Sequence, residues 1–377
     1  MLLRAAVLTP DTAWIHARIG RIWLDRLDFA RAAAAFDTAL RIDPMLDDVR
    51  LGLARCWNRL GRHGDVAGLI AAATTPISSH GLYMRGIAAM GLNRPDLAER
   101  DFRAALADDP THREAAFELG RLLRAGNRLN ELGDLCDHLW ARGARHVQLL
   151  LDRGRVEAYA GRADAARDLL FSPGRISRST LDCPAGFRSL DDFNAGLAAE
   201  LTTNPYPITD VPVDELAMRG ATRIHHLMNG RDPALIRALF TAITACIDRD
   251  VARRIASTPD AAHDPWLQCR PARARLRAWG LIQGHGAYED WHTHRAGWLS
   301  GVYYIAIPEP FSEEGDGDGC IEFGAGPSMA DRYPETLRVA PRAGMLLLTP
   351  SHIHHRTIPF PRPGKRISFA FDVRPLD

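Results

Sequence analysis

Hydrophobic and polar positions follow three patterns along the 377 residues of the chain. In the first half, small and aromatic residues recur at a long interval. Residues 190–202 and 233–255 carry apolar residues at intervals of three and four, which predicts two amphipathic helices. From Ala274 onward, short apolar or alternating runs are separated by Gly, Pro and Asp, which predicts an antiparallel sandwich or barrel. These runs are RLRAWGLIQG, GWLSGVYYIAIP, CIEFG, GMLLLTPS and RISFAFDV.

A repeat of about 33 or 34 residues underlies the first half of the chain. Six positions recur at twice that interval, because each pair is separated by 66 residues. A small residue lets two antiparallel helices approach, an aromatic residue fills the space between them, and proline ends the second helix. This arrangement predicts a solenoid of helical hairpins. The pairs are Gly20 and Gly86, Trp23 and Ala89, Ala32 and Ala98, Phe36 and Phe102, Ala39 and Ala105, and Pro44 and Pro110.

These positions resemble the tetratricopeptide repeat over roughly residues 13–172. The resemblance implies a superhelix whose concave face either binds an extended peptide or only serves as a scaffold for the second half. Residues 171–187 are rich in Ser, Pro, Gly and Arg and lack helical periodicity. We therefore expect a domain boundary there, with a repeat domain at 1–172 and a second domain at 173–377.

Composition and charge argue against nucleic acid and membranes as partners of this chain. A chain with 46% hydrophobic and 25% charged residues is an ordinary globular protein. Its formal net charge of +1 gives no global field that would attract nucleic acid or an anionic membrane, so we expect neither as a partner. No stretch reaches the roughly 20 uninterrupted apolar residues that span a bilayer. The oligomeric state is left open.

The cysteines and the N-terminal residues both favour the cytoplasm. Six cysteines are scattered singly, without the dense spacing of a disulfide scaffold, which favours a reducing compartment. The first residues, MLLRAAVLTPDTAW, hold an apolar patch too short for a secretory signal. We therefore expect a cytoplasmic protein.

Histidines in the last hundred residues predict a metal site. The segment WHTH places His292 and His294 two residues apart, just before a predicted strand, so that both rings can point to one side and share a metal. A third ligand has to come from elsewhere, and the segment HIHH after the run GMLLLTPS is the natural source. A triad of protein ligands leaves positions open for a co-substrate and dioxygen on Fe(II).

Arg366 and Ser368 predict a carboxylate site beside the metal. They stand two residues apart in the run RISFAFDV, so they face one side of a strand. A guanidinium with a hydroxyl beside it can hold a carboxylate through charge-assisted hydrogen bonds. That carboxylate would be the far end of 2-oxoglutarate. Tyr304 and Gln283, on two other predicted strands, are further candidates for contacting the co-substrate.

The segments HTHRAGWLSGVYYI, PSHIHHRTIPF and KRISFAFDV resemble a family of 2OG-Fe(II) oxygenases whose members carry H-x-H, L-S-G-V-Y-Y, P-S-x-x-x-H and R-x-S. The resemblance covers residues 276–373. It implies that His292, His294 and His355 are the metal ligands, with His294 at the place of the usual aspartate, and that Arg366 and Ser368 hold 2-oxoglutarate.

The same resemblance implies the fold class and the activity. We expect an α+β multidomain chain: an all-α repeat solenoid, then a double-stranded β-helix, or jelly roll, with buttressing helices at 187–260 and its core at 274–377. The implied enzyme is a dioxygenase that uses Fe(II), 2-oxoglutarate and O2 to hydroxylate an unactivated C–H bond. Fusion to repeats favours a peptide or protein substrate, because a similar pairing occurs in the aspartyl/asparaginyl β-hydroxylases.

Two other functional classes stay open at this point. The histidines could form a non-redox zinc or nickel site in a cupin-like barrel, although such a site has no need of the carboxylate receptor at Arg366 and Ser368. Alternatively, the barrel could be inactive in an adaptor that works through its repeats. The intact ligand set argues against that second alternative.

Overall fold

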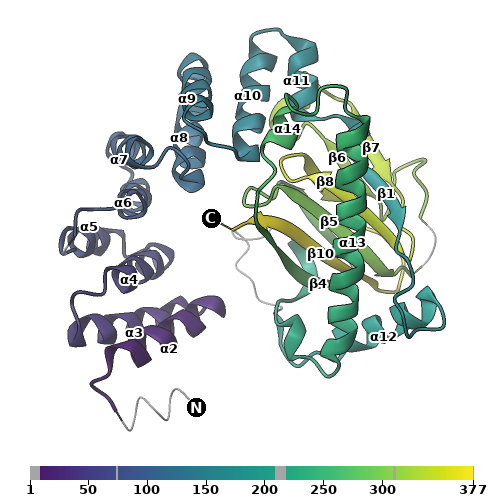
Figure 1. Ribbon diagram of the computed structural model, residues 1–377, viewed down its shortest axis with the longest axis horizontal. Helices are drawn as coiled ribbons and strands as arrows, with labels where there is room; N and C mark the ends of the chain where they lie inside the picture. The colour runs from purple at the N-terminus through teal and green to yellow at the C-terminus, as the bar shows by residue number, and fades with distance from the viewer. Residues whose placement is uncertain (1–8, 74, 209–217, 309–310, 377) are drawn as a thin grey trace. The chain divides into compact units, whose positions relative to one another are not determined.

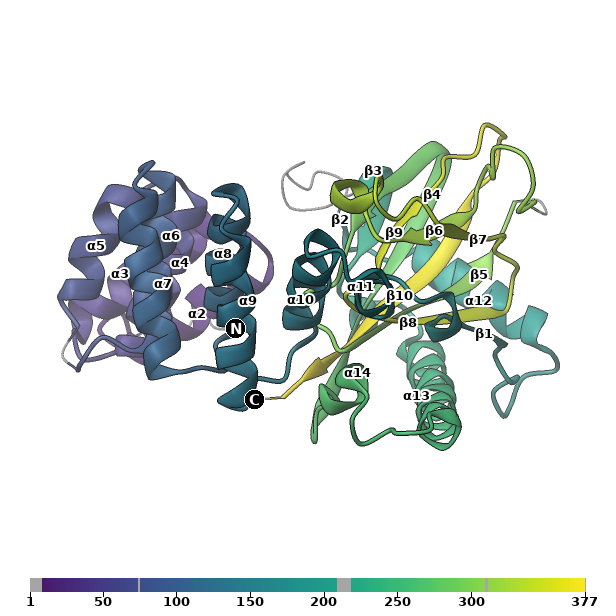
Figure 2. The ribbon, with the colours of Figure 1, turned by 90° about the horizontal axis from the view of Figure 1, so that it is seen from above.

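The computed structural model describes residues 9–73, 75–208, 218–308 and 311–376. The chain divides between Ala144 and Arg145 into two compact units, each of which is described by itself. Together they give the predicted α+β architecture of a helical repeat array and a curled antiparallel sheet (Figures 1 and 2).

The first unit consists of helical hairpins, as the repeat pattern predicted. Each hairpin contains two antiparallel helices that lie side by side (Figure 2). The hairpins are α2 (Ala13–Asp25) with α3 (Phe29–Ile42), α4 (Asp47–Arg59) with α5 (His63–Ala71), α6 (Ser79–Gly91) with α7 (Pro95–Asp108), and α8 (Arg113–Ala125) with α9 (Leu129–Ala141).

Glycine and phenylalanine lock the first and third hairpins by steric fit. A Cβ atom added to Gly20 would lie 2.5 Å from the ring of Phe36, and one added to Gly86 would lie 2.4 Å from the ring of Phe102. Both rings are fully buried. The two helices of each hairpin can therefore approach this closely only with glycine at that point, which is the packing expected from the sequence.

The second unit begins with one more hairpin, α10 (Val147–Tyr159) and α11 (Ala163–Leu170). The repeat series continues into it, since a Cβ atom at Gly154 would meet Leu170 at 2.9 Å. However, Leu151 and Leu170 share a hydrophobic core with Phe323 and Leu347 of the sheet. The hairpin thus belongs to the repeats by sequence pattern and to the second unit by packing.

Among the described residues, ten strands form one antiparallel sheet that curls on itself. The strand order is β1-β8-β5-β10-β4-β9-β6-β7, with β3 also paired to β4 and β2 paired to β3. The long strand β4 connects the two layers: its first part pairs with β10 and its end pairs with β9. The strands are β1 (Ser177–Thr180), β2 (Pro207–Ile208), β3 (Met218–Ile224), β4 (Ala274–His292), β5 (Leu299–Ala306), β6 (Ile321–Gly324), β7 (Thr336–Val339), β8 (Met345–Pro350), β9 (His354–Thr357) and β10 (Arg366–Pro375).

The five predicted runs all contain strands, namely β4, β5, β6, β8 and β10. The sequence did not indicate β7 and β9, whose four residues are too few to show a period. It also missed β1, which lies in the segment expected to be irregular and pairs with the edge of β8. The curled sheet is a double-stranded β-helix, as expected.

Two helices support the outside of the larger layer, α12 (Leu190–Thr202) and α13 (Pro233–Ser257). They match the predicted helices at 190–202 and 233–255. The Tyr303 hydroxyl on β5 donates a 2.6 Å hydrogen bond to Asn194 on α12, and Phe240 on α13 meets the ring of Phe369 on β10 edge-on at 5.4 Å. Since strand side chains alternate, Ser368 next to Phe369 faces the interior of the β-helix.

Shorter elements complete the second unit. In α14 (Pro265–Gln268), Trp266 stacks on Trp298, with ring centroids 4.6 Å apart. Each of the two indole nitrogens donates to the other residue's carbonyl oxygen. Single 3-10 turns lie at Pro173–Arg175, Leu227–Asn229 and Pro327–Met329.

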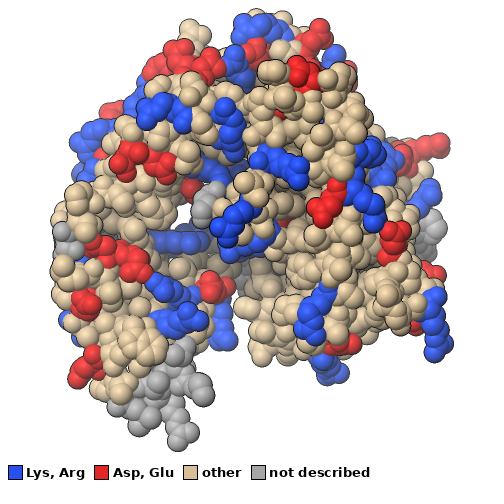
Figure 3. Space-filling view, viewed as in Figure 1, with Lys and Arg blue, Asp and Glu red and all other residues tan. Residues whose placement is uncertain are grey.

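The surface carries charge of both signs. Arg side chains and carboxylates are interspersed on the visible face of both units (Figure 3), in line with the net charge of +1. None of the described helices is long and apolar enough to cross a bilayer. All six cysteines are free, and Cys183 is the exposed one.

Candidate metal and co-substrate site

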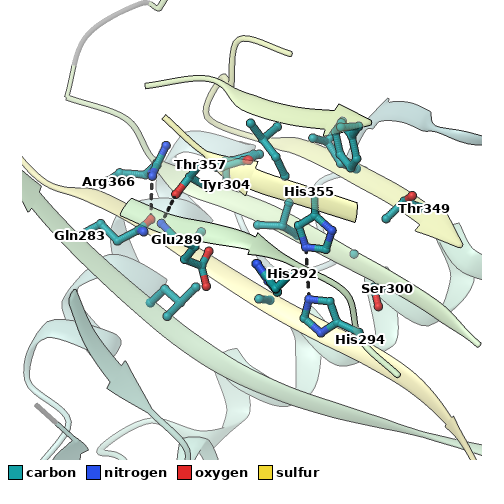
Figure 4. Close-up of a pocket in the computed structure, with 18 of the residues that line it drawn as sticks. Gln283, Glu289, His292, His294, Ser300, Tyr304, Thr349, His355, Thr357 and Arg366 are labelled. Carbon is teal, nitrogen blue, oxygen red and sulfur yellow. Dashed lines mark hydrogen bonds between the residues drawn. The ribbon is translucent and has the colours of Figure 1, made fainter. Parts of the chain in front are cut away.

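Three histidines meet inside the β-helix. His292 is the last residue of β4, His294 follows it in the next loop, and His355 lies on β9 as the cross-strand partner of His292. One potential ligand atom from each ring lies within 4.8 Å of the other two. The Nε2 atoms of His294 and His355 are 3.2 Å apart (Figure 4). Two nitrogens bound to one ion at about 2.1 Å, at right angles, would be about 3 Å apart.

The hydrogen bonds of two rings leave Nε2 available to a metal. The Nδ1 of His292 lies 2.7 Å from the carbonyl oxygen of Asp290, and the Nδ1 of His355 lies 3.1 Å from that of Ile353. A carbonyl oxygen can only accept, so each Nδ1 carries the proton and each Nε2 carries a lone pair. Burial lowers the pKa of both rings, which keeps them neutral, as a metal ligand must be.

His294 is held differently, by a carboxylate. Its Nδ1 lies 2.8 Å from Asp372 Oδ1, and Asp372 is only 1% exposed. The Ser300 hydroxyl donates to the same carboxylate oxygen at 2.9 Å, and Arg374 donates to the other at 2.9 Å. Burial raises the pKa of the Asp372 carboxyl, but the His294 ring and the Arg374 guanidinium outweigh burial and hold it at about 2. Asp372 is therefore an anion at neutral pH.

Arg366 lies in the same pocket, completely buried. Its Nε donates to Gln283 Oε1 at 2.9 Å, and its Nη1 donates to the carbonyl oxygen of Gly319 at 2.7 Å. Its Nη2 and the Nε2 of Gln283 are buried and have no hydrogen-bond partner among the described residues. Burial lowers the pKa of the Arg366 guanidinium. Two unused donors beside a buried cation form a receptor for an anion.

Ser368 and Tyr304 stand beside Arg366 on the pocket wall. They are cross-strand partners on β10 and β5, and both are buried. Burial raises the pKa of the Tyr304 phenol, so this side chain stays protonated and can donate a hydrogen bond. The pocket is lined by Trp279, Leu281, Gln283, Glu289, His292, His294, Ser300, Gly301, Val302, Tyr304, Ile321, Phe323, Leu347, Thr349, His355, Thr357, Arg366, Ser368 and Ala370.

All the site residues predicted from the sequence line this one pocket. One detail differs from expectation. The WHTH segment ends strand β4 rather than beginning β5, because β4 runs on through His292. Asp372, on the same strand as Arg366, contacts His294, Ser300 and Arg374.

Sequence reasoning missed two participants in this site. Asp372 stands six residues after Arg366 on the same strand, so the alternation that joins Arg366 with Ser368 also places Asp372 on the inner face. That signal was present in the sequence. The second participant is the carbonyl oxygen of Gly319, in the loop before β6, and a backbone acceptor leaves no signal in the residue type.

The donor set fits the groups that the family resemblance implies. Three imidazole nitrogens suit Fe(II), and fewer than six protein ligands leave room for a chelating co-substrate and dioxygen. The unused Nη2 of Arg366 and Nε2 of Gln283 suit the remote carboxylate of 2-oxoglutarate.

Two of the solved structures that are similar to this chain each cover 45% of it. One is described as "Crystal structure of YrrB: a TPR protein with an unusual peptide-binding site"; it is 18% identical, with 45% of this chain and 88% of that chain covered and a TM-score of 0.35. Another is described as "Functional Characterization of Pseudomonas Aeruginosa pilF"; it is 17% identical, with 45% and 78% covered and a TM-score of 0.39. Comparison with curated proteins gave no match.

Family comparisons match both halves of the chain. Residues 18–78 and 83–131 match the tetratricopeptide repeat. Residues 277–372, which contain all the pocket positions on β4, β5, β6, β8, β9 and β10, match the family described as "Putative 2OG-Fe(II) oxygenase". The chain therefore carries tetratricopeptide repeats in its N-terminal half and, at 277–372, a region that matches the putative 2OG-Fe(II) oxygenase family.

Proposed function

We propose that this protein is an Fe(II)- and 2-oxoglutarate-dependent dioxygenase that hydroxylates a peptide or protein docked with the help of its repeats. The observation that carries the proposal is the presence, in one pocket, of three convergent imidazoles and a buried arginine with an unused donor. A non-redox metal site has use for the imidazoles but not for that arginine. An inactive adaptor has use for neither.

In the proposed mechanism, His292, His294 and His355 hold Fe(II) through Nε2. Arg366, helped by Gln283, holds the remote carboxylate of 2-oxoglutarate. When bound, iron and 2-oxoglutarate supply the oxidising chemistry, which consumes O2, releases succinate and carbon dioxide and places one oxygen atom on a substrate C–H bond.

The apolar wall keeps that chemistry away from bulk water. Leu281, Ile321, Phe323 and Leu347 are buried and line the pocket together with the imidazoles and Arg366. Excluding water strengthens the contact between Arg366 and a carboxylate, because the local dielectric is low. The protonated Tyr304 phenol gives a further donor on the same wall.

Anaerobic titration tests the first part of the proposal. Fe(II) followed by 2-oxoglutarate should produce a metal-to-ligand charge-transfer absorption in the visible, and the Arg366→Ala protein should need far more 2-oxoglutarate to reach it. Stoichiometric Fe(II) binding without this absorption at any 2-oxoglutarate concentration would favour the non-redox metal site. Failure to bind Fe(II) at all would favour the adaptor.

The substrate class needs a separate measurement. The iron-loaded protein should be incubated with 2-oxoglutarate and a digest of cytoplasmic proteins, and peptides that gain one oxygen atom identified by mass spectrometry. Oxygenated peptides whose yield depends on 2-oxoglutarate would support a peptide substrate. Succinate formation stimulated only by small metabolites would contradict it.

A further inference from the structure

The three histidines of the site differ in what holds their outer nitrogen. His292 and His355 each donate to a backbone carbonyl two residues earlier in the chain. His294 alone contacts a side-chain carboxylate, Asp372 Oδ1, at 2.8 Å. His294 is also the residue that takes the place of the carboxylate ligand in the common iron sites of two histidines and one carboxylate.

A network of fixed partners holds Asp372 in place. The Ser300 hydroxyl donates to Oδ1 and in turn meets the Ser351 hydroxyl at 2.7 Å, while Arg374 donates to Oδ2. Trp279 also restrains the His294 ring, because the two rings are stacked with their centroids 5.7 Å apart and an interplanar angle of 17°. The contact between carboxylate and imidazole is therefore built in, rather than a chance approach of two mobile side chains.

Neutralising Arg374 does not explain Asp372. The side chain of Arg374 is 24% exposed and can be solvated by water, whereas that of Asp372 is only 1% exposed. Burying a carboxylate costs several kcal/mol unless its partners compensate, so the buried Asp372 anion needs more compensation than the partly exposed Arg374 cation. A metal ion on the far side of the His294 ring would provide that reason.

We propose that Asp372 is a positioning residue that supplies, through His294, the negative charge which a carboxylate ligand would supply directly. Three neutral imidazoles would leave Fe(II) with its full double charge. With Asp372 one ring away, the site has the same net charge as two histidines and one carboxylate. A carboxylate bonded to Nδ1 also makes Nε2 a stronger donor and fixes the ring orientation. This inference rests on the metal site of the proposed function.

Cobalt(II) affinity of the full chain, followed by its visible absorption, tests this role without any turnover. Asp372→Asn keeps the size of the side chain and removes its charge, and it should weaken Co(II) binding about 10- to 100-fold, the usual effect of losing such a partner. Glu322→Gln is the matched control, because Glu322 is also buried and paired with arginines, but its hydrogen-bond partners are Thr336, Arg338 and Arg356 rather than a histidine of the site. It should change Co(II) affinity less than about threefold.

A double-mutant cycle separates this role from simple support of the fold. In a His294→Asp protein the imidazole that joins Asp372 to the metal is gone, so adding Asp372→Asn should cost less than about threefold in Co(II) affinity. An equal loss in both backgrounds would mean that Asp372 only supports the fold. The same conclusion would follow if Glu322→Gln reduced Co(II) affinity as much as Asp372→Asn does.

A variant of Arg374 keeps the inference testable should Asp372→Asn fail to fold. Arg374→Gln removes the cation that shares the carboxylate, so Co(II) affinity should stay or rise. A fall in affinity, in a protein with an unchanged melting temperature, would overturn the inference. Absence of Co(II) binding by the unaltered protein is a different result, since it would remove the metal site itself and with it the proposed function.

Discussion

In the repeats, buried side chains fill space or pair with one another, whereas in the β-helix unit several of them hold polar atoms without a protein partner. Gly86 and Phe102 illustrate the first case, a glycine whose missing side chain is replaced by a ring. Arg366 and Gln283 illustrate the second. Among the described residues, every buried side-chain polar atom without a hydrogen-bond partner lies after Ala144.

This difference indicates which of the two units binds a ligand. A space-filling contact stabilises the fold whatever is bound, while an unpartnered buried donor costs about 1 to 3 kcal/mol unless a ligand satisfies it. The packing of the repeats therefore needs no ligand, whereas the unpartnered donors of the β-helix unit indicate a bound molecule.

The largest effect should come from removing a ligand. His292→Ala and His355→Ala should each weaken Fe(II) binding by more than about 100-fold. That loss exceeds the effect of removing a residue that is only hydrogen-bonded to a metal ligand. Isothermal titration under anaerobic conditions measures the affinity, and His285→Ala, outside the pocket lining, is the control. Stoichiometric iron with normal affinity in either variant would rule out the triad.

Removing the carboxylate receptor should separate co-substrate binding from metal binding. Losing one partner of a buried charged contact costs about 2 to 5 kcal/mol, so Arg366→Ala should raise the 2-oxoglutarate requirement about 30-fold or more. Iron affinity should barely change, because Arg366 is not a ligand. Unchanged 2-oxoglutarate binding in a folded, iron-loaded variant would remove the main reason for proposing a 2-oxoglutarate enzyme.

Acid should destabilise the β-helix unit through a buried histidine. Burial, followed by the charge of Arg175, lowers the pKa of His352 from 6.5 to about 4. In the unfolded chain the ring takes up a proton near pH 6.5, but in the folded chain it stays neutral until about pH 4. The metal-free protein should therefore keep its stability above pH 6.5 and lose about 3 kcal/mol between pH 6.5 and 4 from this group.

Denaturant unfolding at several pH values measures that loss, with His352→Gln as the comparison. The variant should show a flatter dependence over the same interval. An identical slope in both proteins would mean that His352 is protonated in the folded state as readily as in the unfolded state.

The smallest effect should come from the repeats. Gly86→Ala places a methyl group against the Phe102 ring, and such overpacking costs about 1 to 3 kcal/mol of unfolding free energy. Gly68→Ala is the matched control, because a Cβ atom there meets nothing within 4 Å and helix propensity should make it slightly stabilising. Iron affinity should be unchanged in both, and a change in either would show that the two units are coupled.

Sequence reasoning predicted the elements well and their register poorly. The spacing of Gly20 and Phe36, or of Arg366 and Ser368, lies within one hairpin or one strand, where periodicity is informative. Pairing His292 with His355, or Arg366 with Gln283, depends on which strands become neighbours and in what register. No local pattern encodes that choice, so the triad rested on the family's motifs until the fold brought its members together.

The hairpin of α10 and α11 sets a limit on how such a chain can evolve. Repeat arrays change length by gaining or losing whole hairpins, since each contacts mainly its neighbours. Here the last hairpin contributes Leu151 and Leu170 to the core that includes Phe323 and Leu347 of the sheet. Duplication or deletion before Arg145 would leave that core intact, but removal of the final hairpin would expose Phe323 and Leu347. Repeat number is therefore free to vary at one end of the array only.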